Sequence, residues 1–156
     1  MGAANIFDPE FEDASDRPEG WRWRYARLGP LIGAEKLGAT VYELPPGAKS
    51  FPYHYEYPGE EWLICLAGNP TLRTPDGERR LEPGDVVCFP GGPRGAHQFG
   101  NETDEPVRVM MLSTMTYPAV AFYPDSGKVL VVPAQGGEGR AVFRQADSVD
   151  YWEGEA

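Results

Sequence analysis

The chain contains only two histidines, and both lie near carboxylates and turn-forming residues. His54 stands two positions before Glu56 and seven before Glu61, and His97 follows 43 residues after His54. Neutral imidazole with carboxylate is a common mixed ligand set for divalent Zn, Mn, Fe or Ni. These residue types therefore point to a metal site, provided that the fold brings them together.

Strand alternation is the simplest way to bring them together, because every second residue of a strand shares a face. A strand over residues 51–57 would place His54 and Glu56 on one face. A Pro-Gly turn then leads to a strand over residues 61–67. If the two strands pair as a hairpin, Glu61 comes opposite His54 and Glu56.

The predicted site needs a physical cause, because a carboxylate on an apolar inner face costs several kcal/mol unless it is paired or metal-bound. A divalent cation removes that cost for the set His54, Glu56, Glu61 and His97. The spacing alone also fits a Glu/His cluster that lines a polar pocket without metal, or a solvated strand face. The intervening tyrosines, Tyr53, Tyr55 and Tyr57, point the opposite way, toward a second sheet or a subunit partner.

Length and composition set the elements that must position these side chains. The 156 residues suffice for one domain with a sizeable core. The 19 glycines and 16 prolines indicate many short strands joined by tight turns, with residues 28–38 as a loop or short hairpin. About ten such strands predict an all-β barrel or sandwich.

Charge excludes some partners. The net charge of −10 and a pI near 4.6 argue against nucleic acid and anionic membrane surfaces. No apolar run approaches the roughly 20 residues of a bilayer span, and no secretory signal pattern opens the chain, so a cytoplasmic protein is expected. Cys65 and Cys88 each sit in an apolar run and are interpreted as buried free thiols, with a disulfide or a metal thiolate as the alternatives.

Two motifs resemble those of the cupin superfamily, over roughly residues 39–115. The first cupin motif, G-x5-H-x-H-x(3,4)-E-x6-G, resembles the stretch from Gly47 to Gly68. The second motif, G-x5-P-x-G-x2-H-x3-N, resembles the stretch from Gly84 to Asn101. The resemblance implies a single jelly-roll β-barrel that holds a metal ion in its interior through His54, Glu61 and His97.

The chain departs from the motifs in three places. Six residues rather than five precede His54, and four rather than two separate Gly92 from His97. The chemical departure is Glu56, which replaces the second motif histidine. Two histidines and two glutamates would bring a divalent centre to zero net charge, which favours harder ions such as Mn²⁺, Fe²⁺ or Zn²⁺ and makes oxalate-like dianions poor ligands.

The expected organisation is an acidic N-terminal arm (residues 1–20), the barrel (21–133) and a C-terminal tail (134–156) docked on the barrel. The favoured function is a metal-dependent enzyme acting on a small organic molecule, of dioxygenase, isomerase or decarboxylase type. The alternative is a non-catalytic cupin that binds or senses a small ligand, with a structural metal or none. The apolar tail and the tyrosine face favour a homodimer.

Overall fold

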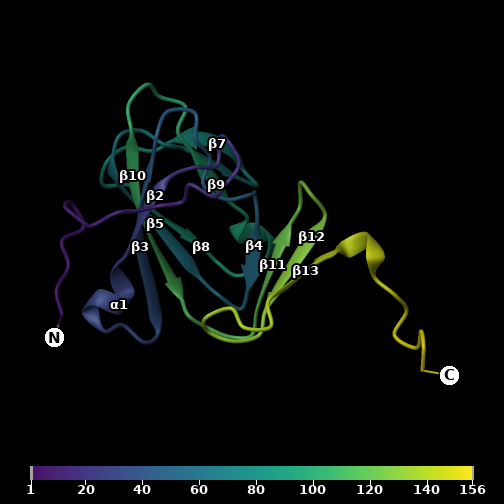
Figure 1. The fold of residues 1–156 in the computed structure, drawn as a ribbon. Helices are drawn as coiled ribbons and strands as arrows, with labels where there is room; N and C mark the ends of the chain where they lie inside the picture. Colours follow the sequence, from purple (N-terminus) through teal and green to yellow (C-terminus); the bar gives the residue numbers. More distant parts are fainter. Residues whose placement is uncertain (1, 156) are drawn as a thin grey trace.

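The computed structural model describes residues 2–155, which fold into three antiparallel sheets with little helix (Figure 1). The largest sheet has the strand order β1-β2-β3-β10-β5-β8. Its strands are β1 (Glu12–Asp13), β2 (Arg24–Arg27), β3 (Leu37–Leu44), β10 (Val107–Thr114), β5 (Glu61–Ala67) and β8 (Val86–Phe89).

The second sheet has the order β13-β12-β11-β4, and the third has the order β7-β6-β9. Their strands are β13 (Ala141–Arg144), β12 (Lys128–Val132), β11 (Ala119–Tyr123), β4 (Tyr55–Tyr57), β7 (Gly77–Arg80), β6 (Thr71–Thr74) and β9 (Gln98–Gly100). Helical turns are limited, within residues 2–155, to α1 (Leu28–Ile32), η1 (Pro93–Gly95) and η2 (Gln145–Asp147). The all-β jelly-roll expectation is confirmed.

The core follows from strand alternation. In β10, Val107, Val109 and Met111 are buried while the residues between them are only half-buried. They belong to one core cluster with Leu44 and Leu63 of the same sheet, with Leu72 and Phe99 of the third sheet, and with Leu81 after β7, all of which are fully buried. The apolar contact between the sheets therefore fixes β5, which carries Glu61, and the strands β4 and β9, which directly follow the two histidines.

The predicted hairpin between residues 51–57 and 61–67 is wrong. The extended segment is shorter than expected, because only β4 forms a regular strand there, and β4 pairs with β11. Strand β5 instead pairs with β10 and β8. The Pro58-Gly59 turn is thus the point at which the chain passes from one sheet to another, so the two strands lie in different sheets rather than side by side.

The segment predicted as a loop or short hairpin over residues 28–38 contains the single turn α1 and the start of β3. Gly33 ends α1 in the left-handed conformation, with φ of 73°. The N–H of Ala34 then donates to the Gly29 carbonyl at 2.9 Å, which satisfies a free carbonyl at the helix end. A glycine is suited to this position because side chains disfavour that φ.

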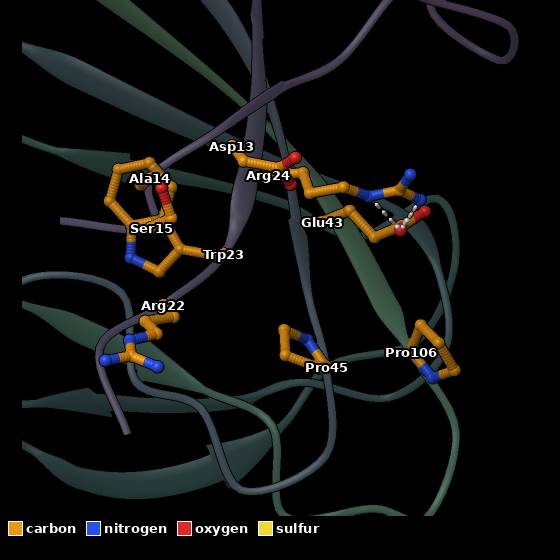
Figure 2. Close-up of a pocket in the computed structure, with 9 residues that line it drawn as sticks. All are labelled: Asp13, Ala14, Ser15, Arg22, Trp23, Arg24, Glu43, Pro45 and Pro106. Atoms are coloured by element: carbon orange, nitrogen blue, oxygen red, sulfur yellow. Dashed lines mark hydrogen bonds and ion pairs between the residues drawn. The ribbon is translucent and has the colours of Figure 1, made fainter. Parts of the chain in front are cut away.

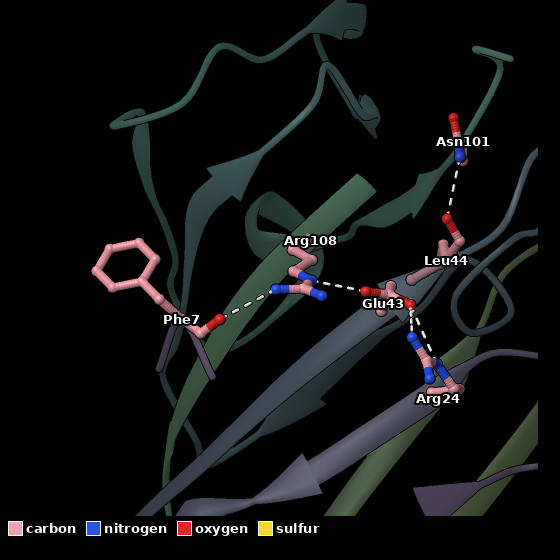
Figure 3. Close-up of polar contacts among 6 residues, drawn as sticks. All are labelled: Phe7, Arg24, Glu43, Leu44, Asn101 and Arg108. Carbon is pink, nitrogen blue, oxygen red and sulfur yellow. Dashed lines mark hydrogen bonds and ion pairs between the residues drawn. The ribbon is translucent and has the colours of Figure 1, made fainter. Parts of the chain in front are cut away.

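A buried ion-pair network ties the N-terminal residues to the large sheet (Figure 3). Glu43 of β3 is only 9% exposed and accepts hydrogen bonds from Arg24 and from Arg108. Burial alone would raise the pKa of Glu43, but these hydrogen bonds outweigh it and lower that pKa. Arg108 also donates to the Phe7 carbonyl at 3.1 Å, and both guanidinium groups lie over the ring of Phe11.

A cavity of about 320 Å³ opens beside this network, between the N-terminal segment and β3 (Figure 2). Its lining includes Ala14, Trp23, Arg24, Glu43 and Pro106. None of the predicted site residues lies in it. This cavity therefore lies where the N-terminal segment contacts the large sheet, away from the predicted site.

The C-terminal tail only partly follows the expectation. Its strand β13 pairs with β12, so residues 141–144 are docked. Beyond that strand the chain leads away from the sheets (Figure 1), and Val149, Tyr151 and Trp152 are exposed rather than packed. The homodimer stays a prediction.

The two cysteines also differ from each other. Cys65 is buried as expected and is a free thiol, but Cys88, which is free as well, is exposed. The prediction for Cys88 was wrong because β8 is the edge strand of the large sheet, and only alternate side chains of that strand face the interior.

Candidate metal centre

The structure brings together three of the four predicted ligands. His54, Glu61 and His97 each offer one ligand atom, and these three atoms lie within 4.8 Å of one another. His97 is fully buried, and the other two side chains are 13% and 17% exposed. The three come from separate parts of the fold, so the cluster exists only when the sheets are assembled.

An isolated β-bridge places the two imidazoles next to each other. The backbones of His54 and His97 exchange both hydrogen bonds, at 3.2 and 2.8 Å, and their ring centroids are 4.9 Å apart. Glu61 opens β5, where it lies opposite Phe89 of β8. The Phe89 ring stacks on the His97 ring at 3.8 Å, which holds that imidazole against β8.

Backbone carbonyls orient both imidazoles. The Nδ1 atom of His54 lies 3.0 Å from the Pro52 carbonyl, and that of His97 lies 2.9 Å from the Gly95 carbonyl. A carbonyl only accepts, so each Nδ1 carries the proton and donates. Each Nε2 then presents its lone pair to the cluster, which is the tautomer that a metal ligand requires.

The donor atoms are spaced for binding a shared cation rather than for hydrogen-bonding to one another. The Oε2 of Glu61 lies 3.5 Å from Nε2 of His97 and 4.0 Å from Nε2 of His54. Two ligands at about 2.1 Å from a tetrahedral ion are roughly 3.4 Å apart. Glu61 Oε2 and His97 Nε2 are buried and have no hydrogen-bond partner among residues 2–155. A divalent ion between them would satisfy both atoms, so the donor set fits one.

The pKa shifts indicate that the cluster lacks a positive charge to stabilise the Glu61 carboxylate. Burial and the neighbouring His54 lower the pKa of His97 to about 3, and burial lowers that of His54. Burial, helped by the Glu56 carboxyl, raises the pKa of Glu61 to about 8. All three groups therefore favour their neutral forms near pH 7. A bound cation would reverse this for Glu61 by stabilising its carboxylate.

Glu56 lies outside the group of three. Strand alternation from His54 is kept, but the Glu56 carboxyl lies against Gly59, where an added methyl group would overlap its Oε1. Burial raises the pKa of Glu56, and its charge acts on Glu61. With only one carboxylate bound, a divalent centre would keep a net charge of +1, so the argument against anionic ligands no longer follows.

A cavity of about 180 Å³ opens at the cluster. Its walls include Thr40 and Tyr42 from β3 and Met111 and Ser113 from β10. The sequence pattern did not predict that these residues belong to a site. They have the composition of ordinary strand residues, and no motif fixes their spacing from the histidines. Burial raises the pKa of Tyr42 to about 12, so its phenol is a neutral hydrogen-bonding group.

Tyr123 of β11 is a further residue beside the cluster that the sequence did not indicate. Its ring stacks on the His54 ring, with centroids 5.7 Å apart and an interplanar angle of 22°. Burial raises the pKa of Tyr123, and the charges of Glu56 and Glu61 add to this effect. The phenol hydroxyl is therefore within electrostatic range of both carboxyls.

The three tyrosines on the other side of residues 53–57 do not form one uniform face. Tyr55 stacks on Phe122 of β11 at 5.1 Å, and Tyr57 meets the same ring edge-on. Tyr53 is buried beneath the guanidinium of Arg73, which lies 3.9 Å from its ring. Packing within the second sheet thus accounts for Tyr55, while Tyr57 remains 46% exposed.

Other motif residues support the loops around the cluster. Asn101 is buried and donates to the carbonyls of Leu44 and Glu105, at 3.0 and 2.8 Å, so it anchors the segment after β9. Gly92 has φ of 93°, and a side chain there would also press on the Tyr57 ring. These residues shape the site without entering it.

No helix within residues 2–155 is long and apolar enough to cross a bilayer. No curated protein matches the chain. A family model described as a cupin domain matches residues 40–113, the part of the chain that carries both motifs.

Solved structures resemble most of the chain. A sugar phosphate isomerase from a cupin superfamily, from Silicibacter pomeroyi, is 28% identical, with a TM-score of 0.81 over 97% of this chain and 98% of that one. A putative sugar phosphate isomerase from Acidithiobacillus ferrooxidans is 25% identical, with a TM-score of 0.78 over 92% and 88%. A Cupin 2 conserved barrel domain protein from Salinispora arenicola shares the fold at 22% identity, with a TM-score of 0.52 over 73% and 87%. Residues 40–113, which carry both motifs, therefore match the cupin domain family, and the whole fold resembles that of a cupin-superfamily structure.

Proposed function

We propose that this protein is a metal-dependent isomerase of a small hydroxylated molecule, of the sugar phosphate class. His54, Glu61 and His97 would hold the divalent ion, which when bound would supply a Lewis acid for the substrate carbonyl. The similarity to two structures named as sugar phosphate isomerases, at 25% and 28% identity, supports this substrate class. Zn, Mn, Fe and Ni all suit the donor set.

The observation that carries the proposal is the second carboxyl beside the cluster. Glu56 stays outside the ligand group, yet its charge raises the pKa of Glu61. Isomerisation of an aldose to a ketose needs a base that removes the proton from C2 and returns it to C1, while the hydroxyl proton moves from O2 to O1. The reaction is redox-neutral overall and needs no other reactant.

Glu56 is suited to that role because burial raises its pKa above that of a solvated carboxyl. A base whose pKa lies nearer to the working pH both takes and returns a proton more readily. The Tyr42 phenol lines the cavity at the metal cluster and can hydrogen-bond a substrate hydroxyl, because its raised pKa keeps it protonated. Glu56 thus moves the proton, and Tyr42 orients the substrate.

The test combines metal analysis with an isomerisation assay. Protein stripped with a chelator is reloaded separately with each of the four metals, and hexose phosphates are followed by NMR in D₂O. The expected result is metal-dependent interconversion with deuterium entering at C1 or C2. Metal binding without turnover of any aldose or ketose would favour a binding or sensing cupin. Oxygen uptake with the native metal would instead indicate a dioxygenase.

A further inference from the structure

The second sheet carries one continuous row of side chains that begins at the metal cluster. Strand β4 pairs with β11 so that Tyr55 lies opposite Phe122. Continuing this register by one position brings His54 opposite Tyr123, in agreement with the stacking of their rings. Tyr123 in turn lies opposite Lys128 of β12, and Lys128 lies opposite Arg144 of β13. Directly opposed residues of antiparallel strands share a face. The row His54–Tyr123–Lys128–Arg144 therefore crosses the whole sheet on one face.

The contacts within the row agree with this register. The Tyr123 ring stacks on His54, and the Lys128 ammonium lies 5.5 Å from the centroid of the Tyr123 ring. Figure 1 shows β11, β12 and β13 side by side next to β4, at the margin of the molecule. Adjacent strands are about 4.8 Å apart, which places the β12 backbone roughly 10 Å from that of His54.

The outer half of the row is positively charged in an acidic protein. Residues 128–147 contain three cations, Lys128, Arg140 and Arg144, against two acids, Glu138 and Asp147, while the whole chain carries a net charge of −10. Neither Lys128 nor Arg144 forms an ion pair within residues 2–155. Arg140 is near enough to the Tyr123 hydroxyl to offset part of the rise that burial causes in its pKa. Unpaired cations gathered in this way attract an anion.

The cavity at the metal cluster is small, whereas the groove beside Lys128 and Arg144 is large. The cavity at His54, Glu61 and His97 measures about 180 Å³, below the roughly 300 Å³ at which small-molecule sites usually begin. A larger groove of about 680 Å³ runs along Lys128, Val142 and Arg144, with Asp147 as its one acidic lining residue. A substrate that fills the cavity at the cluster and carries a further group would place that group outside it.

We propose that Lys128 and Arg144 bind the phosphate group of the substrate whose other end reaches the metal cluster. Tyr123 lies between the two subsites and positions the carbon chain. This inference rests on the proposed function, because it assigns the phosphate of that substrate class to a place on the second sheet. The guanidinium of Arg144 suits a phosphate because its paired N–H groups match two phosphate oxygens.

The experiment measures binding and needs no turnover, so its failure is distinct from failure of the isomerase proposal. Fructose 6-phosphate, fructose and inorganic phosphate are titrated into the full-length, Mn²⁺-loaded protein by calorimetry. The variants are Lys128→Gln, Arg144→Gln and their combination, with the exposed Lys36→Gln and Arg79→Gln as matched charge controls. Each single variant is expected to weaken fructose 6-phosphate binding about tenfold and the double variant about a hundredfold, with Mn²⁺ affinity unchanged.

Lys128→Arg keeps the charge and is expected to retain most of the affinity, which separates loss of charge from loss of fold. The control variants are expected to bind as the unmodified protein does. The proposal is overturned if the double variant binds fructose 6-phosphate normally. It is equally overturned if the unmodified protein binds fructose as tightly as the phosphate ester, or binds neither the ester nor inorganic phosphate.

Discussion

The Nε2 atom of His97 lies 3.5 Å from the Oε2 atom of Glu61, and neither atom has a hydrogen-bond partner among residues 2–155. A buried donor or acceptor left unsatisfied costs about 1–3 kcal/mol. The stacked Phe89 ring and the Gly95 carbonyl hold the imidazole in place. This separation is thus built into the fold and suits an ion between the two atoms.

Removal of a ligand is expected to abolish tight metal binding. Glu61→Gln keeps the shape of the side chain but removes the charge, and it should lower Mn²⁺ or Zn²⁺ affinity by at least about 100-fold, more than the loss of an outer partner costs. Glu60→Gln is the matched control, because Glu60 is exposed and bonds Trp62 instead. Calorimetry of the stripped proteins measures the difference, and equal affinities in the two variants would refute the cluster as the site.

The metal-free protein is expected to lose stability as the pH rises from about 6.5 to 8. The pKa of Glu61 is raised to about 8, so its contribution is complete below the unfolded value of 4.5 and is lost as the pH rises to 8. The pKa of His97 is lowered to about 3, so its contribution grows up to the unfolded value of 6.5. The two trends oppose each other at lower pH, and above pH 6.5 the histidines no longer oppose the trend of Glu61.

The expected loss is at most about 2 kcal/mol over this window, since one proton corresponds to about 1.4 kcal/mol per pH unit. Urea titrations at several pH values measure it. Glu61→Gln should flatten the profile above pH 6.5, and saturating metal should reverse the trend. A stability that rises from pH 6.5 to 8 in the stripped protein would contradict the raised pKa.

Much of the fold follows from local patterns, whereas the strand partners do not. Glycine and proline spacing predicts short strands, and the stretches around His54 and His97 predict the cupin fold. The hairpin prediction failed because pairing depends on contacts far along the chain: β5 pairs with β10, more than 40 residues later. Tyr123 was missed for the same reason, since only the pairing of β11 with β4 brings it to His54.

In the candidate site, too, local patterns predict part of the arrangement and long-range contacts decide the rest. Alternation correctly predicts that His54 and Glu56 share a face, but a shared face does not fix where a long side chain ends. The Glu56 carboxyl turns toward Gly59, which has no side chain to exclude it. Glu61 meets both histidines because β5 lies beside β8, and that adjacency has no local sequence signal.

The Glu43 network is expected to contribute measurably to stability. Glu43→Gln keeps the size of the side chain but replaces two charge-assisted hydrogen bonds, from Arg24 and Arg108, with weaker ones. Because both arginines are partly exposed, we expect a loss of only about 1–2 kcal/mol near pH 7. The lowered pKa of Glu43 means that its contribution is present above the unfolded value of 4.5 and is lost at lower pH. Urea titrations at pH 7 and pH 3 test this, and an equal loss at both would contradict it.

The two thiols are expected to react at very different rates. Cys88 is exposed on the edge strand β8, whereas Cys65 is buried and its pKa is raised to about 11, chiefly by burial. A thiol reagent at pH 8 should therefore modify one group in the folded protein and two in denaturant. Cys88→Ser should remove the group modified under native conditions, and Cys65→Ser should not. Two groups modified equally fast in the folded protein would contradict this placement.

Glu56 separates metal binding from catalysis in the proposed reaction. Because its carboxyl lies outside the ligand group, Glu56→Gln should retain metal affinity within about threefold while lowering kcat by at least about 100-fold, the usual contribution of a general base. Gly59→Ala should act in the same direction, since the added methyl group would displace the Glu56 carboxyl. Metal titration and the isomerisation assay on the same preparations measure both effects. A loss of metal affinity in Glu56→Gln comparable to that in Glu61→Gln would instead make Glu56 a ligand, because only a group bound to the ion affects its affinity so strongly.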